Sequence, residues 1–270
     1  LKKEIKQLEG AASRTSQWSD KIEKSKIGDG HVDKGYIGHQ AARMMQRSKA
    51  IEKRIEKQVE EKKSLLQDVD KKEALTIKPL IFDKKILIEA HGISLNYENR
   101  NIFEKVDFVL ERGDRLAICG KNGSGKSSIL KAAMGQNIPI LGTWKVANNL
   151  KISYVSQSTK ELEGSLSKLA QESQIEEGIF KAMHMKLGFT KDELEKQIQN
   201  LSEGQKKKVL LAKSITESAH LYIWDEPLNF IDILSRIQIE EAIIQYKPTM
   251  LLVEHDDVFI KNVATKLCYL

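Results

Sequence analysis

The sequence predicts an α/β domain with a mixed sheet at its centre, preceded by an antiparallel α-helical hairpin. In residues 1–85, apolar side chains recur at helical spacing on both sides of a glycine-bearing break. From residue 86 onward, short apolar runs alternate with helix-like stretches, and turn residues lie between them. Strands that alternate with helices, led by a strand-rich section, are typical of a layered α/β domain. We therefore expect two units, residues 1–85 and residues 86–270.

The hairpin is predicted from two amphipathic stripes of apolar residues. Neither stripe can be buried by its own helix, so the simplest packing sets one against the other in an antiparallel hairpin. Glycines within residues 25–40 supply the turn, and Pro79 ends the segment. The stripe residues are Ile5, Leu8, Ala12, Thr15 and Ile22 in the first helix, and Ile51, Ile55, Val59, Leu66 and Val69 in the second.

Charge is distributed unevenly along the chain. The 270 residues include 44 Lys or Arg and 38 Asp or Glu, which gives a formal net charge of +6. Residues 1–85 hold 21 of the basic and 14 of the acidic residues, so the positive excess lies in the predicted hairpin. A basic excess that is confined to one segment indicates an anionic partner for that segment.

Composition also excludes several classes of protein. No stretch approaches the roughly 18 to 20 apolar residues that a membrane span needs, and the first residues lack a signal-peptide core, so we expect a cytoplasmic protein without membrane insertion. Cys119 and Cys268 lie in strand-like runs without CxxC spacing or nearby histidines, so neither a disulfide nor a metal role is expected. The missing initiator Met and a last apolar run, residues 266–270, that reads as mid-strand suggest a piece of a longer polypeptide.

Within the second unit, periodicity predicts the individual elements. Residues 190–193, TKDE, supply a capping box for one of the helices. The expected strands are residues 86–97, 102–110, 115–119, 151–155, 221–224, 249–254 and 266–270. The expected helices are residues 126–135, 162–186, 191–200, 203–217, 233–246 and 257–263.

A glycine-rich sequence follows the strand at residues 115–119 and opens a helix. Residues 120–127 read GKNGSGKS and fit the phosphate-binding pattern GxxxxGK[ST], although a chance glycine turn is the alternative. Glycines let backbone N–H groups face phosphate oxygens, and the helix start adds a favourable dipole. Lys126 would reach the β- and γ-phosphates, and the Ser127 hydroxyl would bind Mg²⁺. The predicted ATP-binding residues of this loop are Gly120, Asn122, Gly123, Ser124, Gly125, Lys126, Ser127 and Ser128.

An apolar run at residues 221–224 ends in two carboxylates, Asp225 and Glu226. An α/β sheet presents ligand-binding groups at the carboxyl ends of its strands. Asp225 would hold Mg²⁺, and Glu226 would orient and deprotonate an attacking water as the catalytic base. Alone, an acidic pair after a strand is equally consistent with helix capping, whereas downstream of a phosphate loop it indicates catalysis.

Residues 201–205 read LSEGQ and lie between the phosphate loop and the acidic pair. Ser202 can cap a helix that begins at Glu203, and Gly204 permits close backbone approach, so this helix start is itself a predicted phosphate site. In isolation this pentapeptide reads as an ordinary capped helix. Its position makes it resemble the signature motif of ATP-binding cassette (ABC) proteins, usually LSGGQ. The resembling residues are Leu201, Ser202, Glu203, Gly204 and Gln205, with Glu203 in place of the first glycine.

Further elements resemble the other motifs of this superfamily and occur in the expected order. Tyr97 resembles the aromatic residue that stacks on adenine, and Gln157 resembles the Q-loop glutamine that links Mg²⁺ to the helical subdomain. Asn229 and Asp232 resemble D-loop residues, and His255 resembles the switch histidine that contacts the γ-phosphate and so joins the catalytic group. Taken singly, a Gln or His at a strand end is usually structural, but the shared order of all the motifs makes coincidence negligible.

The resemblance to ABC proteins covers residues 86–270. It implies a helical subdomain at about residues 158–205 and an ATPase that needs a second ABC domain. In such a pair, ATP on the phosphate loop of one cassette is completed by the signature helix of the other. One copy alone should be a poor ATPase.

The order of segments resembles the ABC-F family, in which a helical hairpin links two cassettes. Transporter cassettes meet transmembrane partners, and SMC-type ATPases insert their coiled coil between the phosphate loop and the signature, whereas here the hairpin comes first. Residues 225–232, DEPLNFID, are close to the family's DEPTNHLD. The departures from this form resemble the antibiotic-resistance branch, as does Glu254, which stands where a Ser usually precedes the switch histidine. Residues 35–49 resemble the linker of Lsa-type proteins in the same branch. The resemblance implies a linker plus second cassette, with the first cassette upstream in the same polypeptide.

In the antibiotic-resistance branch, the linker enters the ribosomal exit site, its tip approaches the P-site tRNA, and bound drugs are displaced. The loop near residues 27–40 would be the interaction loop of this chain. Basic side chains there can neutralise phosphates, and flat rings can stack on unpaired bases. A solvated coiled-coil face with a glycine turn has much the same composition. The candidate RNA contacts are Lys34, Tyr36, His39, Arg43 and Arg47.

Two functions remain open at this point. The first is an ATP-gated ribosome-binding factor that confers resistance to ribosome-targeting antibiotics, and the second is the ATPase subunit of a membrane transporter with the hairpin as a regulatory arm. A structural hairpin with a degenerate cassette fits poorly because no catalytic side chain is missing. ATP and Mg²⁺ are the expected cofactors, and a second ABC domain, the ribosome and the P-site tRNA are the expected partners.

Overall fold

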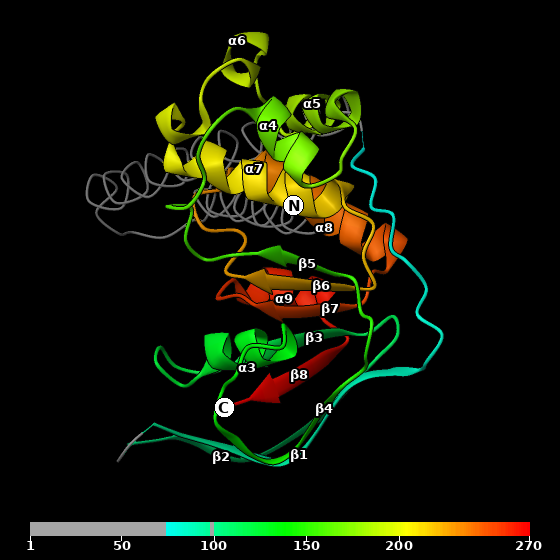
Figure 1. The fold of residues 1–270 in the computed structure, drawn as a ribbon, viewed down its shortest axis with the longest axis vertical. Coiled ribbons are helices and arrows are strands. Elements are labelled where there is room, and N and C mark those ends of the chain that lie inside the picture. Colours follow the sequence, from blue (N-terminus) through cyan, green and yellow to red (C-terminus); the bar gives the residue numbers. More distant parts are fainter. Residues whose placement is uncertain (1–73, 98–99) are drawn as a thin grey trace, which may run out of the picture. The chain divides into compact units, whose positions relative to one another are not determined.

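The computed structural model describes residues 74–97 and 100–270, without the side chains of residues 97 and 100. The predicted hairpin and its candidate RNA contacts lie outside the described residues. Glu73–Leu270 form one compact unit, which Figure 1 shows in colour. Leu75 and Ile77 are buried in the core of this unit, although the sequence placed them in the linker. The domain boundary near residue 85 stays a prediction.

A five-stranded parallel sheet forms the centre of the unit, with the strand order β5-β6-β7-β3-β8. Successive side chains of a strand point to opposite faces, and both faces of this sheet are covered. Leu221 and Ile223 accordingly pack into one core cluster, and Tyr222 and Trp224 pack into the other. The strands are β3 (Arg115–Cys119), β5 (Ile152–Val155), β6 (Leu221–Asp225), β7 (Met250–Val253) and β8 (Lys266–Tyr269).

A smaller antiparallel sheet lies on one side of the central sheet and has the order β2-β1-β4. It consists of β1 (Ile86–Tyr97), β2 (Arg100–Glu111) and β4 (Ile140–Val146). Helix α3 (Lys126–Ala133) packs between the two sheets through Ile129, Leu130 and Ala133. The sequence did not predict β4, because the alternation of polar and apolar residues that marks a half-buried strand is confined to residues 143–146 and no residue of the strand is fully buried.

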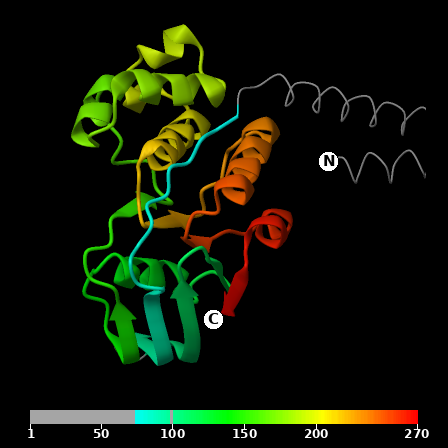
Figure 2. The same ribbon diagram turned by 90° about the vertical axis from the view of Figure 1, so that its right-hand side faces the viewer.

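The helical part lies on the other side of the central sheet, away from the antiparallel sheet, as Figure 2 shows. The predicted single helix 162–186 is wrong: it is interrupted after Glu172, where Gln174 adopts a left-handed φ of 55°. The predicted helix 191–200 is also wrong, since α6 ends at Leu194 although its Thr190–Glu193 capping box is present. The elements are α4 (Leu166–Glu172), α5 (Glu177–Lys186), α6 (Lys191–Leu194), the 3-10 helix η1 (Ile198–Asn200) and α7 (Glu203–Thr216).

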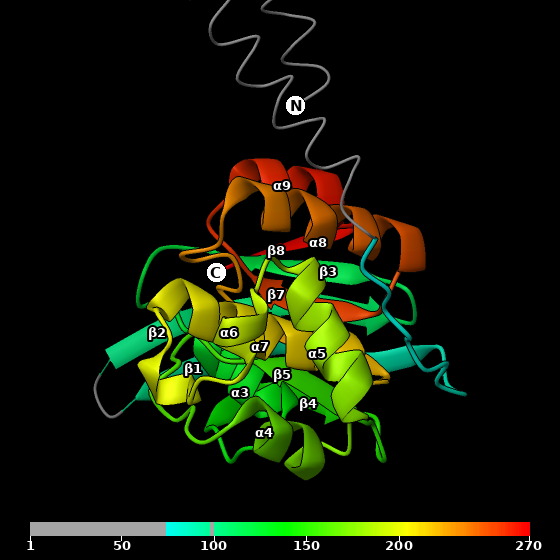
Figure 3. The same cartoon turned by 90° about the horizontal axis from the view of Figure 1, so that it is seen from above.

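Helices α8 (Ile233–Tyr246) and α9 (Asp257–Val263) pack together and contribute to the same core cluster as α7. Figure 3 shows them beside the strands of the central sheet. No helix in the described part of the chain is long and apolar enough to cross a bilayer. Because the central strands are parallel, the loops that follow β3, β5, β6 and β7 leave from one edge of the sheet, and this edge carries the site described next.

Candidate ATP-binding site

Helix α3 begins at the glycine-rich loop without a side-chain cap. Its N-cap residue is Gly125, which has a φ of 91° and offers no side chain to the N–H groups of the first turn. A Cβ at Gly125 would lie 2.8 Å from Ile102 Cγ2 and 2.9 Å from Phe103 Cδ1, so the position needs glycine for both space and conformation. The open helix start supplies free N–H donors of the kind that bind phosphate.

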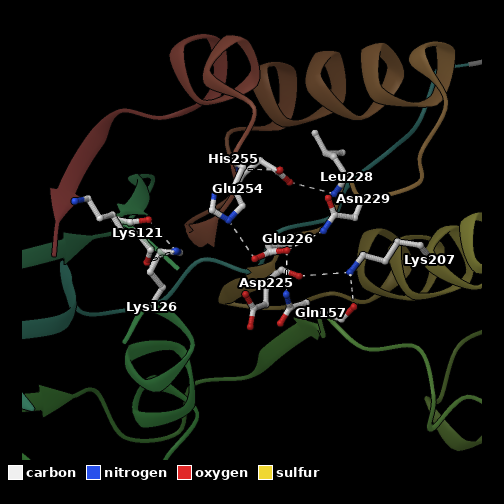
Figure 4. Close-up of polar contacts among 11 residues, drawn as sticks. Lys121, Lys126, Gln157, Lys207, Asp225, Glu226, Leu228, Asn229, Glu254 and His255 are labelled. Carbon is white, nitrogen blue, oxygen red and sulfur yellow. Dashed lines mark hydrogen bonds and ion pairs between the residues drawn. The ribbon is translucent and has the colours of Figure 1, made fainter. Parts of the chain in front are cut away.

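Lys126 is buried and held inside this loop. Its Nζ donates to the carbonyl oxygens of Gly120 at 2.9 Å and Lys121 at 3.1 Å, as Figure 4 shows. These bonds fold the lysine back across the loop that it closes. A triphosphate in the loop would offer charged acceptors in place of the two carbonyls, and hydrogen bonds between charged groups are the stronger kind.

The carboxylate of Asp225 lies buried at the end of β6. Burial raises the pKa of Asp225, and a hydrogen bond from the Ser127 hydroxyl opposes this rise. Its Oδ1 has no hydrogen-bond partner among the residues that the structure describes. A buried carboxylate oxygen without a partner, beside a hydroxyl, is a donor set that fits a hard divalent cation.

Glu226 accepts hydrogen bonds from three different loops, which meet around it in Figure 4. Gln157 Nε2 donates to its Oε2 at 3.0 Å, and Asn229 Nδ2 donates to the same oxygen at 2.8 Å. The Nε2 atom of His255 lies 3.2 Å from Oε1. Glu226 itself adopts a left-handed φ of 47°, which is uncommon for a residue with a side chain. The structure therefore brings four of the predicted site residues into direct contact.

A cavity of about 450 Å³ lies between the loop, the Q-loop glutamine and the end of β6. Its volume falls in the range of small-molecule sites. Nine of the predicted site residues line it, together with Ile102, which the sequence did not suggest. The lining residues are Ile102, Asn122, Gly123, Gly125, Lys126, Ser127, Ser128, Gln157, Glu226 and His255.

The signature residues lie at the start of α7 and are absent from the lining of this cavity. Ser202 Oγ accepts from the backbone N–H of Gln205, and Gln205 Oε1 accepts from that of Ser202, so the predicted cap is a reciprocal capping box. A Cβ at Gly204 would lie 2.6 Å from the carbonyl oxygen of Phe230. Within this chain, the loop that precedes α8 therefore packs closely against Gly204, and the phosphate site at this helix start stays a prediction.

Glu203 replaces a glycine of the usual signature, and both of its carboxylate oxygens have partners. Thr159 donates its hydroxyl to Oε2, and Lys206 Nζ donates to Oε1 at 3.0 Å. The hydrogen bond from Thr159 is the main cause that lowers the pKa of Glu203. The signature helix of this chain thus begins with an ionised carboxylate that is tied to the segment after Gln157.

Asp232 has a structural role in this chain. Its side chain caps α8 by accepting from the backbone N–H of Ser235 at 3.0 Å, and it forms an ion pair with Lys208 of α7. Burial alone would raise the pKa of Asp232, but the bonds from Lys208 and Ser235 lower it to about 2. The predicted D-loop residue therefore ties α8 to the signature helix.

Two buried charged residues of the site escaped the sequence-based prediction, Lys207 and Glu254. Burial lowers the pKa of Lys207 to about 8, while the carboxylates of Asp225, Glu254 and Glu226 favour its charged form. The run Lys206–Lys208 gave no reason to single out its middle member, and Glu254 was noted only as a departure from the usual Ser. The proposed adenine contact at Tyr97 depends on a side chain outside the described part.

The uncapped phosphate loop, the acidic end of β6 and the separate capped start of α7 define a nucleotide-binding domain of the ABC ATPase class. Residues 103–229 match the family model described as ABC transporter. An ATP-binding subunit of an ABC transporter has the same fold, with a TM-score of 0.57 and 23% identity over 68% of this chain and 85% of that chain. A dimeric bacterial ABC transporter cassette gives a TM-score of 0.58, with 16% identity over 68% of this chain and 94% of that one.

Curated relatives narrow the comparison. The probable ATP-binding protein YbiT of Escherichia coli O157:H7 is 32% identical over 68% of this chain and 37% of its own length. The ribosome protection protein VmlR of Bacillus subtilis is 30% identical over 96% of this chain and 48% of its own length. ABC transporter F family member 2 of Arabidopsis thaliana is 29% identical over 82% of this chain and 34% of its own length. The chain thus spans less than half the length of each of these relatives, which include ABC-F members.

Proposed function

We propose that this chain is the hairpin linker and second cassette of a cytoplasmic ABC-F protein of the Lsa-like, antibiotic-resistance type. In this proposal, ATP closes two cassettes, the linker is presented to the ribosome near the P-site tRNA, and hydrolysis releases it. The observation that carries the proposal is the share of the chain that is similar to one relative. The match to the ribosome protection protein covers 96% of the chain, so it extends beyond the cassette into the predicted hairpin.

Binding of ATP would begin at the phosphate loop. The free N–H groups at the start of α3 face the phosphates, and Lys126 exchanges its two carbonyl partners for phosphate oxygens. Ser127, Asp225 and Gln157 are the residues that would hold Mg²⁺, because the Asp225 carboxylate has a free buried oxygen and contacts the Ser127 hydroxyl. The ion, when bound, would neutralise charge on the phosphate oxygens.

Glu226 is the residue that would activate water. It reaches into the same cavity as Lys126 and Ser127, and its carboxylate contacts the proposed switch histidine, His255. As a general base, Glu226 would accept the proton of a water that attacks the γ-phosphate. Gln157 and Asn229, which bond its other oxygen, would fix the orientation of the carboxylate.

A second ABC domain is needed to complete the site. The residues of the signature helix start, residues 201–205, do not line the cavity of their own cassette. Their N–H groups and the Ser202 hydroxyl can therefore meet phosphate only on another cassette. Pairing head to tail would place the signature of each cassette on the nucleotide of the other.

Trapping the closed state tests this proposal. Glu226→Gln, together with the same change in the other cassette of the full-length protein, should stop hydrolysis and leave the protein bound to ribosomes in the presence of ATP. Co-sedimentation with ribosomes measures this, and Lys126→Ala in the same background serves as the control that should not bind. Absence of the trapped variant from the ribosome fraction with saturating ATP would eliminate ribosome binding as the function.

The alternative is the ATPase subunit of a membrane transporter, which the likeness to transporter subunits keeps open. Stable copurification with an integral membrane protein would favour it. Deletion of residues 27–40 separates the two functions, since drug resistance should disappear if the loop acts on the ribosome and should persist if the hairpin is a regulatory arm.

A further inference from the structure

Lys207 lies on the face of α7 that packs against the central sheet, and it is 1% exposed. Its Nζ donates to the carbonyl oxygen of Ser156 at 2.7 Å, of Gln157 at 3.3 Å and of Asp225 at 3.4 Å. An ammonium group has three N–H donors, so the three carbonyls account for all of them. Lys207 therefore joins the signature helix to the segment after β5 and to the last residue of β6.

A buried ammonium is stabilised only where hydrogen bonds and opposite charge replace water. The carboxylates of Asp225, Glu254 and Glu226 supply the opposite charge at Lys207. Asp225 and Glu226 have roles in the proposed chemistry, but Glu254 has none. Glu254 follows β7 and is 6% exposed.

Glu254 bonds the main chain in the same way as Lys207, from the opposite side of Glu226 in Figure 4. Its Oε2 accepts from the backbone N–H of Leu228 at 3.1 Å, and its Oε1 accepts from that of His255 at 2.9 Å. One buried carboxylate thus holds both the loop after β6 and the loop after β7. The two buried charges together bond the main chain after β5, at and after the end of β6, and after β7, which are the three segments around the Glu226 carboxylate.

The main-chain groups that Lys207 and Glu254 bond belong to the donors of Glu226 or to a residue next to a donor. Lys207 holds the main chain of Gln157, and Glu254 holds the main chain of His255, and both of these residues contact the Glu226 carboxylate. Asn229, the third donor, directly follows Leu228, whose N–H is bonded to Glu254. Glu226 itself directly follows Asp225, whose carbonyl is bonded to Lys207.

We propose that Lys207 and Glu254 form a buried pair of oppositely charged positioning residues that fixes the three donors of Glu226 and connects them to the signature helix. The inference rests on the proposed function in one respect, the role of Glu226 as the base. It assigns to the pair the placement of the donors and no contact with the nucleotide. A change at either residue should therefore act on turnover more than on ATP binding.

The test compares four variants of the full-length protein: Lys207→Met, Glu254→Gln, the double variant, and Lys213→Met. Lys213 is the matched control, because it lies on the same helix and pairs with Glu217, away from the cavity. Steady-state ATP hydrolysis gives kcat and KM, and thermal unfolding gives Tm. Glu226→Gln provides the reference for loss of the base.

Each single variant of the pair should lower kcat by about 10- to 100-fold, with KM changed little, because the donors of Glu226 shift while the phosphate loop is intact. Each should also lower Tm, since it removes main-chain hydrogen bonds and leaves the buried charges less well balanced. The double variant should recover Tm but not kcat. Lys213→Met should leave both kcat and KM as in the unmodified protein.

Recovery of kcat together with Tm in the double variant would show that the pair acts only on stability, and would overturn the inference. An unchanged kcat in Lys207→Met, with hydrolysis abolished in Glu226→Gln, would overturn it as well. If instead Glu226→Gln hydrolyses ATP at the normal rate, the assignment of the base is what fails. The two failures are thus told apart within one set of measurements.

Discussion

The starts of α3 and α7 are the two helix N-termini for which we propose phosphate binding, and they differ in how they are capped. The α3 start has Gly125 as its N-cap, no side-chain hydrogen bond at the cap and no acidic residue in its first turn. The α7 start has a complete capping box between Ser202 and Gln205, and Glu203 lies in its first turn. The first has no side chain bonded to its N–H donors, whereas the second satisfies two of its donors, the N–H groups of Ser202 and Gln205, with its own side chains.

The difference in capping indicates which of the two helix starts gains more hydrogen bonds from phosphate. An uncapped helix start gains hydrogen bonds when phosphate arrives, so the phosphate loop can bind ATP within one cassette. A capped start that carries a carboxylate gains less from the same phosphate. The signature half should therefore contribute only after two cassettes have come together on nucleotide already held by the phosphate loop.

The largest change in ATP binding is expected at Lys126, at the start of α3. Lys126→Ala removes a buried cation from the phosphate loop, and we expect ATP affinity to fall by about 100-fold, since hydrogen bonds to charged groups contribute roughly 1.5–3 kcal/mol each. Titration with a fluorescent ATP analogue measures the affinity. Lys131→Ala, at the exposed far end of α3, is the control and should bind as before. Equal binding by both variants would contradict the role of the loop.

Low pH should lower the free energy of unfolding through His184, which lies on α5 in the helical part. This side chain is buried in α5, its Nδ1 lies 2.8 Å from the Phe180 carbonyl oxygen, and the rings of Phe180 and Phe189 pack edge-on against it. Burial lowers the pKa of His184 to about 4 from 6.5, so the unfolded chain takes up a proton first as the pH falls. The contribution of neutral His184 to the free energy of unfolding should be fully present above pH 6.5. About 3 kcal/mol of this free energy should be lost as the pH falls from 6.5 to 4.

Denaturant unfolding at a series of pH values measures this loss. His184→Leu keeps an apolar side chain of similar bulk and removes the titrating group, so its stability should vary less over the same pH range. A parallel decline in both proteins would assign the acid sensitivity to other residues.

Gly204→Ala tests the start of α7 separately from the phosphate loop. The added Cβ would meet the Phe230 carbonyl oxygen at 2.6 Å, and overpacking of this kind costs about 1–3 kcal/mol. We expect weaker ATP-dependent pairing of cassettes, measured by light scattering, with unchanged ATP affinity of the single cassette. Gly178→Ala on α5 is the matched control, because a Cβ there would lie at an ordinary contact distance of 3.7 Å from Glu176 Oε1. Reduced ATP affinity in Gly204→Ala would mean that the two halves are not separate.

The smallest expected effect belongs to Glu203. Glu203→Gln removes a negative charge from the helix start that would face the phosphate of the other cassette, and the effect of such a charge is small at an exposed position. The ATP concentration that gives half-maximal pairing should therefore fall by about two- to fivefold. Thermal stability should decrease slightly, because the same charge favours the helix dipole. A higher ATP requirement would show that Glu203 assists pairing.

The sequence predicted best where one local pattern decides the structure. The predicted cap at Ser202 and the predicted capping box at Thr190 are confirmed, and residues of the loop before Lys126 line the cavity. Local hydrogen bonding and glycine conformation are properties of a few neighbouring residues, and so they can be read from order alone. All seven expected strands of the second unit have counterparts for the same reason, since their apolar runs are short and bounded by turns.

Prediction was weakest where position in three dimensions decides the role. Three consecutive lysines precede Val209, and only packing of α7 against the sheet selects Lys207 for burial. A long lysine side chain can place its charge in water from many positions, so periodicity does not mark the buried one. Likewise, the break before α5 depends on a left-handed Gln174, a residue type that gives no turn signal.

Glu226 already accepts hydrogen bonds from Gln157, Asn229 and His255 in the cassette described here. Oε2 receives two of these bonds and Oε1 only one, so the acceptor position that is left lies on Oε1. In the proposed mechanism, the attacking water would occupy this position. The loops that carry the three donors would then determine where water can approach the base.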